Sequence, residues 1–261
     1  MRTLSQSNFL KIIEGRDYEF LINGYPFDLR ESVHLVNRQL HSQHHYHFKN
    51  CRLSTFTVSD TDISSHWSFE NCQFDELVVE SSRVANFEFH NCIMGDVLYK
   101  SNEDAGVLKI HGCKINYLEY LSNPKFDLLH IGCNNLLDKV NIIDNGAKNT
   151  DDSKFYLCPE KFNAIRIERL AASKLEIGTF GEYSNLFLSE IQTDHLLLRN
   201  CNNKNSKVTF KRVSPKSQKG SVLQFLDSTI GASVFENDFF NSYLSVEYKN
   251  SSITNFALAS S

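Results

Sequence analysis

Apolar residues recur at every fifth position over most of this chain, and this period constrains the fold more than any other feature. One uninterrupted run contains Phe69, Phe74, Val79, Val84, Phe89 and Met94. The same step continues, with occasional steps of six, as far as Leu258. A helix would repeat roughly every 3.6 residues and an antiparallel strand every second residue, so neither explains the pattern. Two or three extended residues followed by a turn do explain it.

The cysteines mark a longer period. Five of the seven follow one another at intervals of 21, 20, 21 and 20 residues, namely Cys51, Cys72, Cys92, Cys113 and Cys133. Asn precedes four of the seven cysteines and Gly precedes two, and these residue types tolerate a left-handed backbone. Only Cys158, which follows Leu157, differs. One cysteine interval is therefore expected to form one coil that turns a corner just before the thiol.

Four steps of five residues make one coil, which predicts an all-β fold: a right-handed parallel β-helix, or solenoid, with coils of about 20 to 21 residues. Each coil is expected to have four short faces, and roughly ten coils should follow Phe48. The residue two positions before each member of the apolar run should also point inward. These residues are Trp67, Cys72, Leu77, Ser82, Phe87 and Cys92. Stacked cysteines would then form an interior ladder of small packing groups, because free thiols pack as small hydrophobes.

This pattern resembles the pentapeptide-repeat family, whose members build a right-handed, four-sided β-helix from apolar residues at five-residue intervals with small residues two positions earlier. The resemblance covers most of residues 48–258. The family's usual Asp or Asn before the central residue is replaced here by Gln73, Val78, Arg83, Glu88 and Ile93. Large residues also stand where the family prefers small ones, as at Leu77 and Phe87. A broader, irregular right-handed β-helix is therefore the alternative cross-section.

The two ends of the chain differ. Residues 1–47 lack the five-residue register and are predicted to form an N-terminal cap, while residues 48–261 form the solenoid in the same structural domain. A solenoid must cover its open strand edges, and the apolar residues near Phe9 and Phe20 suit that role. The chain is still in register at Leu258, so the last coil is expected to pair with a second copy or dock on another domain or partner.

Composition indicates a cytoplasmic protein. The N-terminus does not read as a signal peptide, no apolar run is long enough to span a membrane, and seven cysteines favour reduced thiols over a disulfide framework. The formal net charge of −4 argues against both an indiscriminate nucleic-acid binder and a strongly acidic DNA mimic. The DNA-mimicking gyrase modulators known in the pentapeptide-repeat family need an acidic surface, which the basic segment described next interrupts.

Four polar interruptions, at 95–107, 143–154, 202–207 and 214–220, are expected to project from the solenoid as loops. The last two lie in a segment without acidic residues that holds seven basic ones: Arg199, Lys204, Lys207, Lys211, Arg212, Lys216 and Lys219. These seven are the predicted partner-binding residues, for a protein or an anionic macromolecule such as nucleic acid. Ordinary solvated lysines are the alternative. Aromatic residues for base stacking are scarce there, with Phe210 alone inside the segment.

A histidine cluster precedes the first regular coil and comprises His34, His41, His44, His45 and His47. If it formed a strand, His45 and His47 would share a face, which is compatible with a metal site. No carboxylate or thiolate lies between His34 and Lys49, however, and no CxxC pair exists elsewhere. We therefore predict no metal and no other cofactor, and expect the cluster to line the solvated edge of the cap.

An enzyme that acts on polysaccharides, a lyase or a glycoside hydrolase, is the main catalytic alternative. Its carboxylates would have to converge on neighbouring coils, and Asp60, Asp62, Glu80 and Arg83 are the nearest candidates. The chain contains no GxSxG elbow, no glycine-rich phosphate loop and no activated Cys beside a His. The preferred interpretation is a non-catalytic scaffold without catalytic residues, which binds a macromolecular partner through its loops and basic segment.

Overall fold

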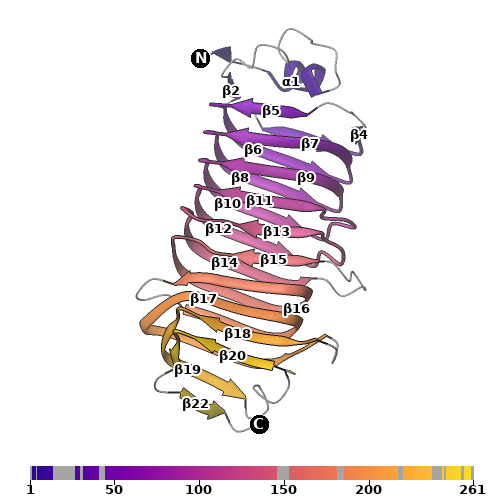
Figure 1. Cartoon of the computed structure of the whole chain (residues 1–261). Helices are drawn as coiled ribbons and strands as arrows, with labels where there is room; N and C mark the ends of the chain where they lie inside the picture. The colour runs from indigo at the N-terminus through magenta and orange to yellow at the C-terminus, as the bar shows by residue number, and fades with distance from the viewer. Residues whose placement is uncertain are drawn as a thin grey trace.

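The protein is an all-β parallel solenoid of about eight turns, each of about 21 residues, with almost no helix, as seen in a computed structural model (Figure 1). The structure describes residues 2–3, 5–13, 27–29, 32–40, 45–145, 153–180, 185–216, 220–236, 243, 245–253 and 256–259. The expectation of roughly ten coils is too high, because some coils are longer than the cysteine interval. Leu129, for example, pairs with Phe155 one coil later.

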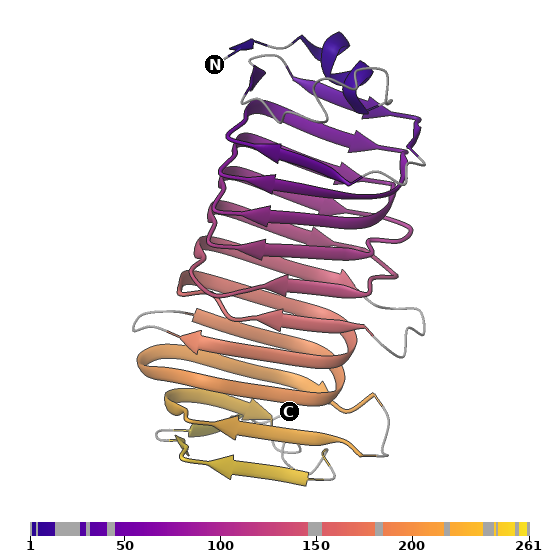
Figure 2. The same ribbon diagram turned by 45° about the horizontal axis from the view of Figure 1, so that its top comes forward.

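Two series of strands form the long sides of the coils (Figures 1 and 2). The even-strand sheet contains β6 (Arg52–Ser59), β8 (Gln73–Glu80), β10 (Ile93–Lys100), β12 (Lys114–Leu121) and β14 (Leu136–Asn145). The odd-strand sheet contains β7 (Asp62–Glu70), β9 (Arg83–His90), β11 (Val107–His111), β13 (Leu128–Ile131) and β15 (Lys154–Leu157). Each strand pairs in parallel with the strand one coil away, so residues at one register position form columns along the axis.

Towards the C-terminus the strands run through the corners. β16 (Lys161–Phe180) and β17 (Asn185–Ser214) each contribute to both sheets, and β16 pairs with both β14 and β15. Five shorter strands follow: β18 (Val222–Leu226), β19 (Thr229–Glu236), β20 (Ser245–Lys249), β21 (Ser252–Ile253) and β22 (Phe256–Ala259). The side chains of β22 lie outside the described residues, so the predicted docking role of the last coil stays a prediction. No helix within the described ranges is long and apolar enough to cross a membrane.

The inward positions are those that the five-residue period predicts. All six residues of the run from Phe69 to Met94 are buried, and so are the six residues two positions earlier, including Trp67 and Ser82. Aromatic rings stack along the axis inside the coils, as where the Phe69 and Phe89 ring centroids lie 5.1 Å apart. One continuous apolar core therefore runs through the described coils and supports both sheets.

Each coil has two long sides rather than four short faces. β8 pairs with β10 on either side of Asp75 and Gly95 but not through these two residues. A Cβ atom at Gly95 would lie 2.2 Å from the backbone oxygen of Asp75, so only glycine permits this close approach. In the described ranges the left-handed residues other than glycine stand at the two corners, for example Ser81 (φ 50°) and Asn91 (φ 53°). The strands are therefore interrupted in mid-length without turning a full corner there.

The cysteine ladder forms at one corner. Asn50, Asn71, Asn91 and Gly112 all adopt left-handed φ angles, and the cysteine that follows each of them is buried. The backbone N–H of Cys92 donates to Sγ of Cys113 over 3.3 Å, which connects consecutive coils. These thiols point inward and pack, as predicted.

Cys133 does not belong to this ladder, which corrects the prediction. Its side chain is exposed, and the left-handed corner falls at Asn134 (φ 62°) instead of at Gly132. Asn135 takes the inward place, where its Oδ1 accepts a hydrogen bond from the Cys113 N–H over 2.7 Å. This coil is longer than the cysteine interval. Cys133 therefore keeps the regular spacing in the sequence, but its side chain does not reach the buried corner position.

The opposite corner holds a buried polar ladder that the sequence analysis missed. Its members are Thr61, Ser82, Asn102, Asn123 and Asn145. Oδ1 of Asn123 accepts from both the backbone N–H and Nδ2 of Asn102, each over 3.0 Å. Nδ2 of Asn123 donates in turn to Oδ1 of Asn145 and to the backbone oxygen of Tyr99. Buried amides satisfied in this way connect successive coils and stiffen the corner.

The predicted loops are smaller than expected where they are described. β10 extends to Lys100 and Asn102 is buried, so only residues 103–106 separate this corner from β11. β14 includes the first part of the 143–154 segment, and residues 146–152 lie outside the described ranges.

The other two predicted loops fall around β17. The 202–207 segment lies within this strand, with a register shift opposite β19 between Asn203 and Lys207. Ser214 ends the strand, and residues 217–219 lie outside the described ranges.

Helix α1 (Gln6–Ile13) lies over the first coil, as expected of a cap (Figure 2). Phe9 is fully buried, and its ring centroid lies 5.6 Å from that of Phe48. The Tyr46 hydroxyl donates to the backbone oxygen of Ile13 over 2.6 Å. Parallel pairing nevertheless begins before residue 48, because β3 (Val33–Val36) pairs with β6, and β5 (Tyr46–Lys49) pairs with β7. The first coil thus lies within the region predicted as cap.

Candidate functional site

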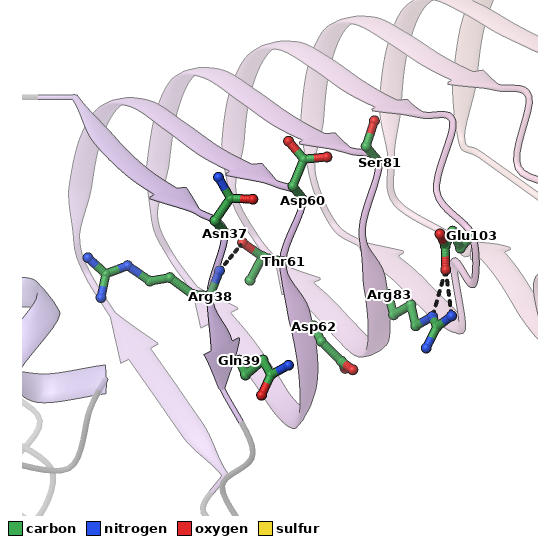
Figure 3. A pocket seen from close by; sticks show the side chains of 9 residues that line it. All are labelled: Asn37, Arg38, Gln39, Asp60, Thr61, Asp62, Ser81, Arg83 and Glu103. Atoms are coloured by element: carbon green, nitrogen blue, oxygen red, sulfur yellow. Dashed lines mark hydrogen bonds and ion pairs between the residues drawn. The ribbon is translucent and has the colours of Figure 1, made fainter.

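A polar groove lies at the asparagine-ladder corner near the N-terminal end (Figure 3). It has a volume of about 410 Å³ and begins beside β4 (Gln39–Leu40). Its lining residues are Asn37, Arg38, Gln39, Asp60, Thr61, Asp62, Ser81, Arg83 and Glu103. The groove follows the corner over several coils and contains most of the charged residues considered for an enzyme.

These charged residues do not form a converging acid–base pair. Nη2 of Arg83 lies 2.6 Å from Glu103 Oε2, so this guanidinium already has a carboxylate partner. Figure 3 shows the side chains of Asp60 and Asp62 pointing away from each other. Glu80 does not line the groove and is ion-paired to Lys100 over 3.1 Å. General acid–base cleavage of a glycosidic bond requires two carboxyl groups aimed at one bond, and this arrangement does not provide them.

The even-strand sheet carries a surface rich in unpaired lysines, which we call the lysine face: Lys114, Lys139, Lys161 and Arg166, on β12, β14 and β16. The three lysines are exposed, and within the described ranges no ion pair joins any of them to a carboxylate. Nζ of Lys139 lies 5.5 Å from the centroid of the Tyr117 ring. The permanent positive charge of these lysines is therefore available to a ligand.

A groove of about 320 Å³ crosses the lysine face. It exists because Ala164 stands in one outward column between Lys139 and Asn185, which have longer side chains. Its lining residues are Lys139, Val140, Asn141, Ala164, Ile165, Arg166, Asn185, Leu186, Phe187 and Thr209. The guanidinium carbon of Arg166 lies 5.7 Å from the Phe187 ring centroid, and its Nη2 lies 2.7 Å from Glu168. The lining thus offers the Lys139 ammonium, amides and one aromatic ring and contains no carboxylate, while the Arg166 guanidinium already has Glu168 as a partner.

The odd-strand sheet presents a row of histidines, which we call the histidine face: His45, His47, His66, His90, His111 and His130. The rings of His90 and His111 are stacked with centroids 5.5 Å apart, and those of His111 and His130 meet edge to face at 4.7 Å. Glu88 lies among them, with its carboxylate 2.6 Å from Nζ of Lys109 and 3.4 Å from Nε2 of His66. Cross-strand pairing places His90 beside His111, whereas His130 pairs with Lys109 and reaches the His111 ring diagonally.

The protonation equilibria of this face follow from its contacts. Burial, followed by the charges of His130 and His90, lowers the pKa of His111. Burial and the charge of Lys109 lower the pKa of His130. Burial opposes ionisation of Glu88, but the hydrogen bond and charge of Lys109 lower its pKa overall. At neutral pH the carboxylate is thus charged, while His111 and His130 are neutral.

The predicted basic segment does not form one cluster among its described side chains. Arg199 extends from the odd-strand sheet to Glu176 over 3.3 Å, whereas Arg212 stands at a left-handed corner and contacts Glu190 over 3.1 Å. Lys211 is exposed and Lys216 is half-buried. The side chains of Lys204 and Lys207, and all of Lys219, lie outside the described residues. Two of the seven predicted partner-binding residues, Arg199 and Arg212, are therefore already ion-paired with carboxylates of neighbouring coils.

The N-terminal histidine cluster is only partly described. His34, His45 and His47 are exposed, while His41 and His44 lie outside the described ranges. Nε2 of His47 lies 3.2 Å from Glu70, and the His45 ring lies 5.1 Å from that of His66. In the part of the chain that the structure describes, no group of three or more His, Cys, Asp or Glu side chains is arranged to hold a metal ion.

Comparison with known proteins adds no identity: no family model, no curated protein and no solved structure matches this chain. The fold and the surfaces described above are therefore the basis for the functional inference.

Proposed function

We propose that this chain is a non-catalytic recognition scaffold that binds an extended anionic macromolecule along its lysine face. The carrying observation is that Lys114, Lys139 and Lys161 are exposed on one sheet face without a carboxylate partner among the described residues. Cations with no internal partner raise the local potential and attract polyanions. The groove beside Ala164 would orient such a ligand, because its lining contains Lys139, unpaired among the described residues, and no carboxylate.

The solenoid is well suited to binding an extended partner. Strands one coil apart lie about 4.8 Å apart, so the columns of outward side chains form a regular array parallel to the axis. The interior ladders hold successive coils in register, so little ordering is required on binding. A cytoplasmic location and self-association through the C-terminal coil are further parts of the proposal.

The test compares the lysine face with the basic segment. Anisotropy of a labelled single-stranded oligonucleotide, titrated at several salt concentrations at pH 7.5, would be measured for the wild type and two variants. We expect Lys114→Gln/Lys139→Gln/Lys161→Gln to weaken binding at least tenfold, and to reduce the slope of log K against log salt by about 2. The matched control is Lys211→Gln/Arg212→Gln, which removes two cations from the basic segment.

Two results would count against the lysine face. If only the Lys211→Gln/Arg212→Gln variant loses binding, the basic segment is the site. If the wild type binds neither the oligonucleotide nor a heparin probe in low salt, the anionic-partner proposal fails.

A further inference from the structure

We propose that the histidine face is a second binding surface, which takes a chain of phosphate groups and becomes available only in mild acid. This inference does not rest on the lysine face, because it uses the opposite sheet and different residues. It arises from three features of the described structure: a line of imidazoles, carboxylates that are already paired, and the groups that surround each ring.

The imidazoles form a stepped line: His90 and His111 share one register column along the axis, whereas His130 pairs with Lys109 in the neighbouring column. His90, His111 and His130 come from β9, β11 and β13, one from each successive coil, with ring centroids 5.5 and 4.7 Å apart. Tyr156 continues the line, 5.6 Å from the His130 ring. His90 stacks on the His111 ring and His130 meets that ring edge to face, so little of the His111 ring face is open to a stacking base. The histidine face is therefore better suited to donating ring N–H groups than to stacking bases.

The carboxylates of this face already have lysine partners. Glu70 lies 3.0 Å from Nζ of Lys49, and Glu88 lies 2.6 Å from Nζ of Lys109. Glu176 of β16 is paired with both Lys174 and Arg199. With neutral histidines the face is therefore close to electrically balanced. Glu88 lies 3.6 Å from Nε2 of His90, but among the described residues no carboxylate forms an ion pair with His111 or His130. Each proton that these two rings take up therefore adds a positive charge to the face.

The neighbours of the central ring, His111, delay its protonation. β9 contributes Glu88 and His90, β11 contributes Lys109, and β13 contributes His130. Only Glu88 among these favours the charged form, whereas burial and the three other groups oppose it.

His130 is in a similar position. Lys109 of β11 opposes its charge and the more distant Glu176 favours it, while Tyr156 of β15 packs against the ring. The pair is thus neutral near pH 7 and gains charge as the pH falls below about 6.5.

A linear polyanion fits this surface because its charges repeat along one direction, as the imidazoles do. A phosphate group accepts several N–H donors and keeps its negative charge in mild acid. Such a chain of phosphates is found both in a nucleic-acid backbone and in inorganic polyphosphate. Binding would be coupled to proton uptake by His111 and His130, so affinity must rise as the pH falls.

The experiment measures binding of a labelled single-stranded oligonucleotide at pH 7.5 and pH 5.5, at one fixed ionic strength. We expect the wild type to bind at least tenfold more tightly at pH 5.5. The variant His90→Gln/His111→Gln/His130→Gln should lose this gain and keep the pH 7.5 affinity. The matched control, His34→Gln/His195→Gln, removes two exposed histidines outside the line and should retain the gain. Circular dichroism at both pH values confirms that each variant is folded.

Further arms separate the possible outcomes. The variant Lys114→Gln/Lys139→Gln/Lys161→Gln should keep the pH-dependent gain, even if it binds nothing at pH 7.5, so failure of the proposed function is distinguishable from failure of this inference. Unlabelled inorganic polyphosphate should compete at pH 5.5 as the oligonucleotide does, and competition by only one of them identifies the source of the phosphates. Equal wild-type affinity at both pH values would overturn the inference, and so would a gain that survives in the triple histidine variant. Equally strong competition by heparin would overturn the assignment to phosphate.

Discussion

The lysine face and the histidine face are built on the same coils, yet they carry different kinds of charge. Lys114, Lys139 and Lys161 are exposed and have no carboxylate partner among the described residues. On the histidine face Glu70, Glu88 and Glu176 are ion-paired with cations. The imidazoles there include His111, whose pKa is lowered by burial. A solenoid can present two chemically distinct surfaces because its fold depends on the inward residues alone, which leaves the outward columns free to differ.

The largest expected effect tests whether both faces depend on one core. Leu77→Asp in β8 or Phe89→Asp in β9 would bury a carboxylate in a fully apolar interior, at a cost of more than about 4 kcal/mol. We expect neither variant to yield soluble folded protein. Val78→Asp, one residue from Leu77 but pointing outward, is the control and should fold. Expression and circular dichroism check this, and normal folding of both inward variants would show that the register is wrong.

The next effect compares the two corners that join the sheets. Asn123→Ala leaves the donors of Asn102 without their acceptor, and each buried polar group left unpaired costs about 1 to 3 kcal/mol. Cys92→Ala removes a packing group at the opposite corner together with weak thiol hydrogen bonds to the backbone oxygens of Phe69 and His90, which should cost about 1 kcal/mol. Urea unfolding at pH 7.5 should therefore show a clearly larger loss for Asn123→Ala. An equal loss in both variants would mean that the asparagine ladder adds no stability beyond packing.

A smaller effect is the pH dependence of folding stability, to which the histidine face should contribute through His111 and His130. The folded-state pKa values of His111 and His130 lie below the ordinary value of 6.5, so the unfolded chain takes up these protons first. Their contribution opposes folding in acid: stability is lost as the pH falls below about 6.5, until the folded-state pKa values are passed. We expect His111→Gln/His130→Gln to flatten the decline in urea midpoint between pH 7.5 and 5, relative to His34→Gln/His195→Gln. An unchanged decline would contradict the pKa shifts.

The smallest effect concerns the thiols. Cys133 is exposed, whereas burial, followed by the charges of Glu176 and Cys133, raises the pKa of Cys158 to about 11. Iodoacetamide at pH 7.5 should therefore modify Cys133 first and Cys158 slowly. Cys72 and the other ladder thiols should react only after unfolding. Peptide mass spectrometry at successive times measures the order in which the thiols are alkylated. Early labelling of Cys72 would contradict its burial at the corner.

Much of the interior could be predicted from the sequence, because every coil must fill the same space. Phe69, Phe74 and their equivalents repeat for that reason, and Asn91 precedes a left-handed corner as its residue type suggested. Cys133 was misplaced because spacing alone cannot reveal that a longer coil moves the corner to Asn134. Asn102 resembled a loop residue, since an amide is buried only when other coils supply its partners.

The outward surfaces were less predictable. The described part of the histidine face is assembled by cross-strand pairing from residues about one coil apart, and the sequence analysis saw only the local cluster at His34 to His47. The lysines of the lysine face are likewise scattered in sequence, whereas the contiguous basic segment was conspicuous. In the structure, two members of that segment, Arg199 and Arg212, are ion-paired to carboxylates of the neighbouring coil. Contiguity in sequence is thus a weak guide to outward columns in a solenoid.

The most direct test of the two-face account is amide chemical-shift mapping of the ¹⁵N-labelled protein with an oligonucleotide at pH 7.5 and again at pH 5.5. The account predicts shifts on β12, β14 and β16 at pH 7.5, with additional shifts on β9, β11 and β13 at pH 5.5. Shifts confined to residues 199–216, or the same pattern at both pH values, would contradict it.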